Sequence, residues 1–245
     1  MKNIFSLTKR NFKEILREPL SIVFCLIFPV FMLVLMSLIF TNMTVIPPNF
    51  SIENYACGIC IFGYTFIGMF VALQISADKN TSFIKRINIA PISKFSYFAS
   101  FVFSALPLAI LQTIIFFAVA LLFKYPINTN LLLAIVYLIP SALMYITLGI
   151  LVGVICNNEK QTGPISSIFI SLAGIFGGVF MPVDTFTGGF AKFVNALPFS
   201  HSVSIASEIH TIGATAIYPH ILYVVGYTLV FVALTILINQ IKSKK

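Results

Sequence analysis

The sequence predicts an all-α membrane protein with six transmembrane helices and an amphipathic helix in front of them. Three observations support this class: hydrophobic residues make up 59% of the 245 residues, charged residues only 9%, and the mean hydropathy is +1.02. A soluble domain usually carries about 25% charged residues, so this chain has too few to cover a surface in water. We expect one membrane domain, 1–245, because the length leaves no room for an ordinary soluble domain beside it.

The first segment, Met1–Pro19, mixes apolar and basic residues at helical spacing. Its predicted apolar stripe is Ile4, Phe5, Thr8, Phe12, Ile15 and Leu16. We expect residues 1–19 to form an elbow helix in the headgroup plane, because a plain positive flank needs charge but no apolar stripe. The residues expected to anchor it are Lys9, Arg10, Phe12, Lys13 and Arg17. Charge throughout this segment, with no small-residue cleavage site, argues against a cleavable signal.

Six uncharged runs follow, and each is long enough to cross about 30 Å of hydrocarbon. These runs are Leu20–Phe40, Tyr55–Ala77, Ser96–Phe123, Leu131–Cys156, Gly163–Val183 and Ile221–Ile241. In the fifth run Gly174, Gly177 and Gly178 allow a close helix approach, either within this chain or across a dimer, or represent ordinary glycine use.

The segment 184–219 is predicted to be an outer loop or re-entrant cap. Its apolar run Phe193–Ser207 is short and contains Asn195, Pro198 and His201. We therefore expect this run to lie at the interface or to re-enter the membrane rather than to span it.

The basic residues predict the orientation of the chain in the membrane. Six spans place both termini on one side, and that side collects all of the 15 basic residues except Lys124 and Lys192. Basic loops stay in the cytoplasm, so we expect a multi-pass plasma-membrane protein with both termini cytoplasmic. This topology explains the net charge of +8 better than binding to nucleic acid does.

The loop 78–94 is the candidate coupling segment. A short helix is predicted to start after Asn80 or Thr81 and to stop at Pro91. The residues expected to couple the chain to a cytosolic partner are Asp78, Thr81, Phe83, Ile84, Lys85, Arg86 and Ile87. A solvated connector would need the positive charges but not an apolar face, so we interpret the helix as a docking surface.

Several kinds of chemistry are missing from the sequence. It has no Gly-x-x-x-x-Gly-Lys-Ser/Thr nucleotide loop, and no carboxylate lies within a predicted span. Cys57 and Cys60 have the spacing of a redox or metal pair, but no second pair or nearby histidine supports one. His201, His210 and His220 do not match a ligand pair. We expect no catalytic residue, no metal site and no cofactor bound by this chain.

A few residues are candidates for a substrate pathway or an outer gate. They are Gln112, Phe180, Pro182, Pro198 and Phe199. For a polar residue at depth such as Gln112, hydrogen bonding between helices is the alternative interpretation.

Four motifs together resemble the type-2 ATP-binding-cassette (ABC) transporter permease family over nearly the whole chain. They are the basic N-terminus with Glu18-Pro19 and a first span containing Pro29; Asp78-Lys79-Asn80-Thr81 followed by Pro91-Ile92-Ser93; Gly177-Gly178-Val179-Phe180-Met181-Pro182-Val183-Asp184; and Leu197-Pro198-Phe199-Ser200-His201. The family usually has glycine at the position of Asn80, which leaves the identity of the docking partner open.

The resemblance implies a permease subunit of an ABC exporter, not an enzyme. It implies six spans, a second permease subunit in a homo- or heterodimer, and cytosolic ATPase subunits that hold ATP and Mg²⁺. The cargo it implies is an amphipathic or hydrophobic drug, peptide or lipid-linked molecule. Two alternatives stay open: a channel or secondary carrier that needs no ATPase, and a membrane immunity or sensing subunit.

Overall fold

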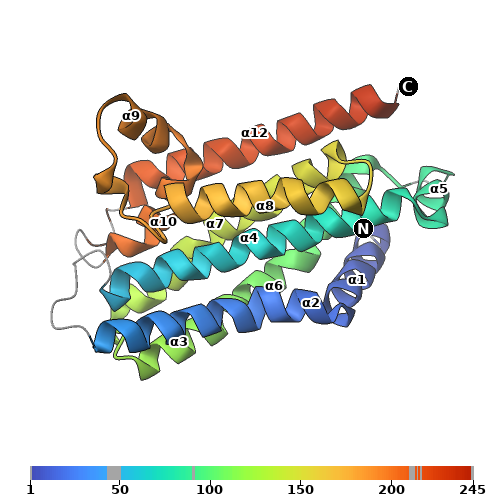
Figure 1. Cartoon of the computed structure of the whole chain (residues 1–245). Helices are drawn as coiled ribbons and strands as arrows, with labels where there is room; N and C mark the ends of the chain where they lie inside the picture. The colour runs from blue at the N-terminus through green and yellow to red at the C-terminus, as the bar shows by residue number, and fades with distance from the viewer. Residues whose placement is uncertain are drawn as a thin grey trace.

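The computed structural model describes residues 2–42, 51–89, 92–209, 213, 215 and 217–243. In this part of the chain every regular element is a helix, and the long helices lie side by side between the two ends of one bundle (Figure 1). The helices long and apolar enough to cross a membrane are Pro19–Thr41, Ile52–Lys79, Lys94–Leu122, Thr129–Ile155 and Ile217–Lys242. The predicted all-α membrane class is confirmed, and the described residues contain five of these candidate spans.

The helix α4 (Ile52–Lys79) is the centre of the bundle and is buried along most of its length. It packs against α7 (Thr129–Ile155), α8 (Glu159–Phe176) and α6 (Lys94–Leu122). All four cysteines are free and buried, as expected for small apolar residues. α4 therefore contacts most of the other long helices.

The first span is not one regular α-helix. It consists of α2 (Pro19–Ile22), the π-helical turn η1 (Val23–Ile27) and α3 (Phe28–Thr41). Pro29 has no N–H to donate and its ring crowds the preceding turn, and the wider π turn lies directly before it. The Phe28 amide accordingly reaches back to the carbonyl of Val23.

The fifth predicted run, Gly163–Val183, is shifted and shortened in the structure. Its helix α8 begins earlier, at Glu159, and ends at Phe176, so polar residues take up part of its length. Gly178 has a φ of +79° and the amide of Phe180 bonds to the carbonyl of Gly174, which closes the helix end. The glycines therefore allow the chain to turn at the end of α8. A Cβ on Gly174 would meet the ring of Phe180.

The segment after α8 contains short helices rather than an open loop. They are η3 (Val183–Thr185), α9 (Gly188–Ala196) and α10 (Pro198–Ser207), and the last long helix, α12 (Ile217–Ser243), follows. The predicted run Phe193–Ser207 is divided at Pro198, which starts α10. Neither part is long enough to span a membrane. His210 lies outside the described residues.

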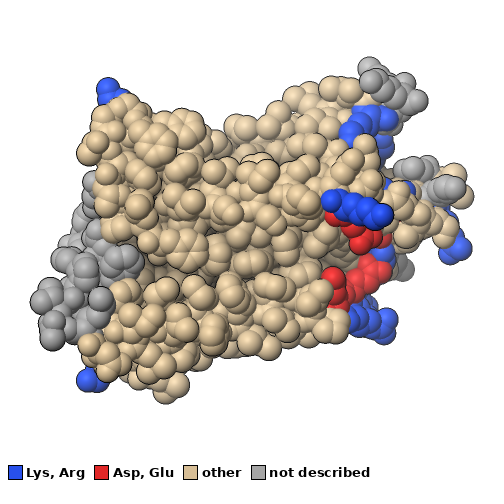
Figure 2. All heavy atoms as spheres, viewed as in Figure 1, with Lys and Arg blue, Asp and Glu red and all other residues tan. Residues whose placement is uncertain are grey.

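One end of the bundle carries most of the charge. The helix α1 (Lys2–Arg17), the helix α5 (Ser82–Ile89) and the end of α12 all lie at this end (Figure 1). Lys, Arg, Asp and Glu gather there, whereas the long sides of the molecule carry almost no charge in the view of Figure 2. This separation is the pattern of a protein with apolar sides in lipid and one basic end in water.

A helix, α1, is present over the residues predicted for the elbow, and it turns one face to the bundle. Its buried residues are Leu7, Asn11 and Ile15, whereas Phe5 is 74% exposed. The helix packs mainly on α6. Of the predicted stripe, Ile15 packs in the core while Phe5 and Leu16 are exposed, so the placement of α1 in the headgroup plane stays a prediction.

Candidate functional site

The helix α5 lies between α4 and α6 at the charged end, as the sequence predicts for a coupling segment (Figure 1). Its apolar face is largely covered by the chain itself: Ile87 is only 8% exposed, and Phe83 and Ile84 are half-buried against the core. The sequence predicts that a cytosolic partner binds this face, which in the chain alone packs partly against the bundle, so docking there stays a prediction. Among the side chains of α5 that the structure describes, Ser82, Arg86 and Ile89 are exposed, the last to 87%, and the side chain of the predicted coupling residue Lys85 lies outside them.

Asp78, another predicted coupling residue, is buried and paired within the chain. It is 3% exposed and accepts two hydrogen bonds from Arg10, at 2.9 Å to Oδ2 and 2.5 Å to Oδ1. The hydroxyl of Tyr97 donates to the same carboxylate at 3.0 Å. Asp78 therefore joins α1, α4 and α6 and is not open to a partner, while Thr81 is exposed and donates to the Asp78 carbonyl.

Arg10 connects this ion pair to α5. Its guanidinium lies over the ring of Phe83, 3.6 Å from the ring centre, and also pairs with Glu14 at 2.8 Å. Burial alone would lower the pKa of Arg10, but hydrogen bonds and charge from Asp78 and Glu14 raise it. One cation in the middle of α1 thus contacts both the end of α4 and the start of α5.

The other predicted anchors of α1 point outward. Lys9, Lys13 and Arg17 are exposed and Phe12 is half-buried. Polar contacts also hold α1. The Asn11 amide donates to Ser100 at 2.9 Å, a contact not predicted from the sequence, and the Gln74 amide donates to Glu14 at 2.6 Å. Glu14 follows Asn11 and Arg10 by three and four positions, about one helical turn, and this spacing is the signal that could have revealed this face.

Two lysines close the C-terminal end of α7, and sequence reasoning did not identify them. Lys79 Nζ donates to the carbonyls of Gly153, Val154 and Cys156 at 2.7, 2.8 and 2.5 Å. Lys242 Nζ donates to the carbonyls of Val154 and Ile155 at 3.0 and 2.6 Å. Unpaired carbonyls and the negative end of the helix dipole explain why cations collect there. The ends of α4, α7 and α12 are thereby joined.

The predicted pathway and gate residues do not form one site. Gln112 is 1% exposed and donates to the carbonyl of Cys60 at 3.0 Å, so it bonds α6 to α4. Phe180 is 44% exposed and packs edge-on against Phe62. Phe199 is buried against Tyr145, Pro198 starts α10 and Pro182 precedes η3. Except for Gln112, these residues lie at the end opposite α5.

At that opposite end a hydrogen-bonded chain links α9, α10 and α12. His201 Nε2 lies 2.8 Å from the carbonyl of Asn195, and its Nδ1 lies 2.7 Å from Nδ1 of His220. His220 Nε2 lies 3.1 Å from Glu208. Burial lowers the pKa of His201, with a further decrease from His220 and only partial compensation by Asn195 and Glu208. A neutral His201 can donate from Nε2 and accept at Nδ1 from His220 Nδ1–H. The bond to the Glu208 carboxylate then requires a second proton, on His220 Nε2, so every link of the chain has a donor and an acceptor when His220 carries both ring protons.

Comparison with known proteins identifies the chain. No curated protein matches it. Residues 2–210 match the family described as the ABC-2 type transporter, which covers every element from α1 to α10. Permeases of this family are non-catalytic transport subunits that pair with ABC ATPase subunits, and ATP binds to the ATPase. With its apolar bundle and the short α5 at the basic end, the chain therefore belongs to the ABC-2 type transporter family, as a membrane-spanning permease subunit.

Proposed function

We propose that this chain forms half of the transmembrane unit of an ATP-driven exporter. In this proposal a cytosolic ATPase docks on α5, and a second permease subunit completes the pathway. The cargo is an amphipathic or hydrophobic molecule that leaves the cell. The observation that carries the proposal is the position of α5, which is tied to α1 through Arg10 and Phe83 and still presents Arg86 and Ile89 outward.

The mechanical route follows from these contacts. Closure of the ATPases on ATP pushes α5 toward the bundle, where Phe83 and Arg10 pass the force to Asp78 at the end of α4. Because α4 packs on α6, α7 and α8, its displacement rearranges the bundle. The exposed Arg86 orients the partner more than it adds affinity, because a solvated charge at a rim contributes little binding energy.

Ile89→Asp is expected to release the ATPase without unfolding the permease. Burial of an isoleucine in a partner groove contributes roughly 1.5–3 kcal/mol, so its loss weakens docking about 10-fold or more. The measurement is the amount of ATPase that co-purifies with the permease from native membranes. Ile127→Asp is the matched control, because Ile127 is 83% exposed at the other end of the bundle.

Full retention of the ATPase by the Ile89→Asp variant would show that α5 is not the docking surface. Transport that continues without any ATPase would favour a channel or carrier. Cargo that accumulates on the permease without release outside the cell would favour an immunity or sensing subunit.

We also propose that α8 is the sixth span and that both termini are cytoplasmic. The supporting observation is that α8 runs beside α4 between the same two ends of the bundle (Figure 1). Lys192→Cys and Lys124→Cys are then expected to react with an impermeant thiol reagent in intact cells, and Arg86→Cys only after permeabilisation. The native cysteines are all buried, which keeps the background low. Labelling of Arg86→Cys in intact cells would reverse the orientation.

A further inference from the structure

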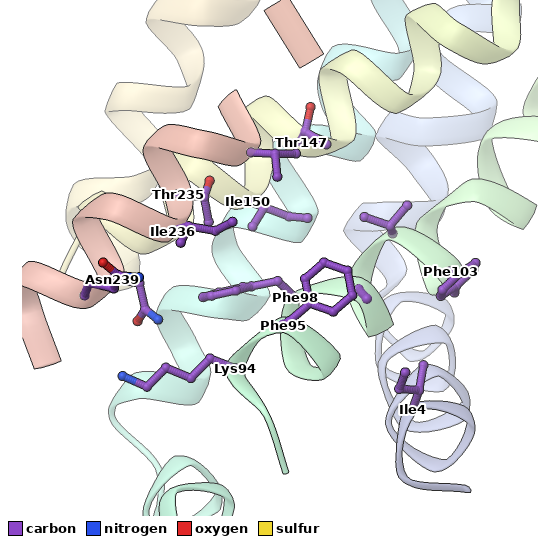
Figure 3. Close-up of a pocket in the computed structure, with 14 residues that line it drawn as sticks. Ile4, Lys94, Phe95, Phe98, Phe103, Thr147, Ile150, Thr235, Ile236 and Asn239 are labelled. Atoms are coloured by element: carbon purple, nitrogen blue, oxygen red, sulfur yellow. The ribbon is translucent and has the colours of Figure 1, made fainter. Parts of the chain in front are cut away.

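An apolar groove opens between α6, α7 and α12 on the side of the bundle. Its volume is about 490 Å³. Phe95, Phe98, Val102, Ile150 and Ile236 supply much of its lining, and Figure 3 shows these helices around it. A groove of this size and character fits a hydrocarbon chain rather than a polar solute.

A second cavity, of about 580 Å³, adjoins the first toward α5. The two share the lining residues Lys94, Phe98 and Asn239. The second cavity also has Lys79 and Lys242 in its wall, and no Asp or Glu is among the described residues that line it. The pair of cavities is therefore apolar at one end and basic at the other.

The positive charge in the second cavity lacks a counter-ion within the described ranges. Lys79 and Lys242 donate to carbonyls and, for Lys242, to the side chain of Asn157, and none of the ion pairs found there includes either lysine. Lys94 is exposed at the start of α6 and extends from the chain beside Asn239 in Figure 3. Backbone carbonyls satisfy hydrogen bonds, but they do not neutralise three cations.

We propose that this composite groove binds one anionic lipid from the adjoining leaflet. Its headgroup lies at Lys94, Lys79 and Lys242, and an acyl chain lies along Phe98, Val102 and Ile236. Basic pockets between membrane helices, near the bundle end where headgroups lie, suit such a ligand in both charge and depth. A helix of a second permease copy would fill the apolar part only. The bound lipid would contact both α5 and α12, because Ile84 and Ile87 of α5 line the basic cavity.

The test uses the full-length chain in nanodiscs of phosphatidylcholine, alone or mixed with phosphatidylglycerol. Native mass spectrometry then counts the lipids that stay on the protein after its release from the nanodisc. We expect phosphatidylglycerol to be retained in preference to phosphatidylcholine, and Lys94→Ala to reduce its retention about five-fold. Ala99→Trp, which fills the apolar groove, should reduce retention without any change of charge.

Lys9→Ala is the matched control, since Lys9 is an exposed cation at the same end of the bundle but does not line the groove. If the Lys9 and Lys94 variants lose phosphatidylglycerol equally, its retention comes from diffuse attraction to the charged surface, and the proposed site is overturned. Equal retention of both lipids, or disulfide-linked dimers of an Ile236→Cys variant, would also overturn it, the latter in favour of a second copy. The ATPase co-purification test is independent of these outcomes.

Discussion

Gly149→Val is expected to force α4 and α7 apart and to prevent stable assembly of the permease. The backbones of the two helices touch at this point: a Cβ on Gly149 would overlap the carbonyl oxygen of Gly68. One turn further along α7, a Cβ on Gly153 would lie 2.9 Å from the carbonyl oxygen of Ala72. No rotation of a side chain can relieve a clash with backbone, so we expect a loss of about 3 kcal/mol, at the upper end of overpacking effects.

The measurement is the thermal unfolding midpoint of the purified protein in detergent, together with its yield from membranes. Gly226→Val is the matched control, because a Cβ on Gly226 in α12 would meet nothing within 4 Å. If both valine variants unfold at the same temperature, the close contact between α4 and α7 is not what stabilises the bundle.

Asp78→Ala is expected to detach the elbow helix from the bundle. The change leaves Arg10 and the hydroxyl of Tyr97 without their shared acceptor in a site where Asp78 is 3% exposed. Removing one partner of a buried ion pair usually costs about 3–5 kcal/mol, and the partial exposure of Arg10 places this case at the lower limit. The loss of α1 anchoring should appear as faster proteolysis within residues 2–17 and a lower unfolding midpoint.

Glu14→Gln is the control for this prediction. It removes the exposed carboxylate that pairs with the same Arg10 but keeps an acceptor for Gln74, so it should cost less than about 1 kcal/mol. The double variant Arg10→Ala/Asp78→Ala should be no less stable than Asp78→Ala alone, because the unpaired charge is gone. Additive losses from the two substitutions would contradict a direct pair.

Several features of this protein could be predicted from local sequence patterns. Long uncharged runs require helices in a membrane because every backbone polar group must be satisfied there, and five of the six predicted runs coincide with candidate spans. The short helix between Asn80 and the following span, and the amphipathic α1, also follow from residues close in sequence. The family could be identified because its motifs keep their order and spacing along the chain.

Other features depended on contacts between segments far apart in sequence. The motif containing Asp78 suggested a residue that couples to a partner. In the structure the Asp78 carboxylate accepts hydrogen bonds from Arg10, which lies 68 positions away. The sequence suggested a close helix approach at the glycines of the fifth run. In the structure the backbones of α4 and α7 approach closely at Gly68 and Gly149.

The sequence by itself determined the membrane class, the positions of most spans and the existence of α1 and α5, because hydrophobicity and helical periodicity act over short stretches. Only the tertiary structure decided which charges are paired. α5 buries the apolar face that its own sequence predicts. In α1 the buried face also includes Asn11, and hydrogen bonds from Arg10 to Asp78 and from Asn11 to Ser100 tie it to other helices. A pattern within one helix cannot contain that information, since the partners come from other helices.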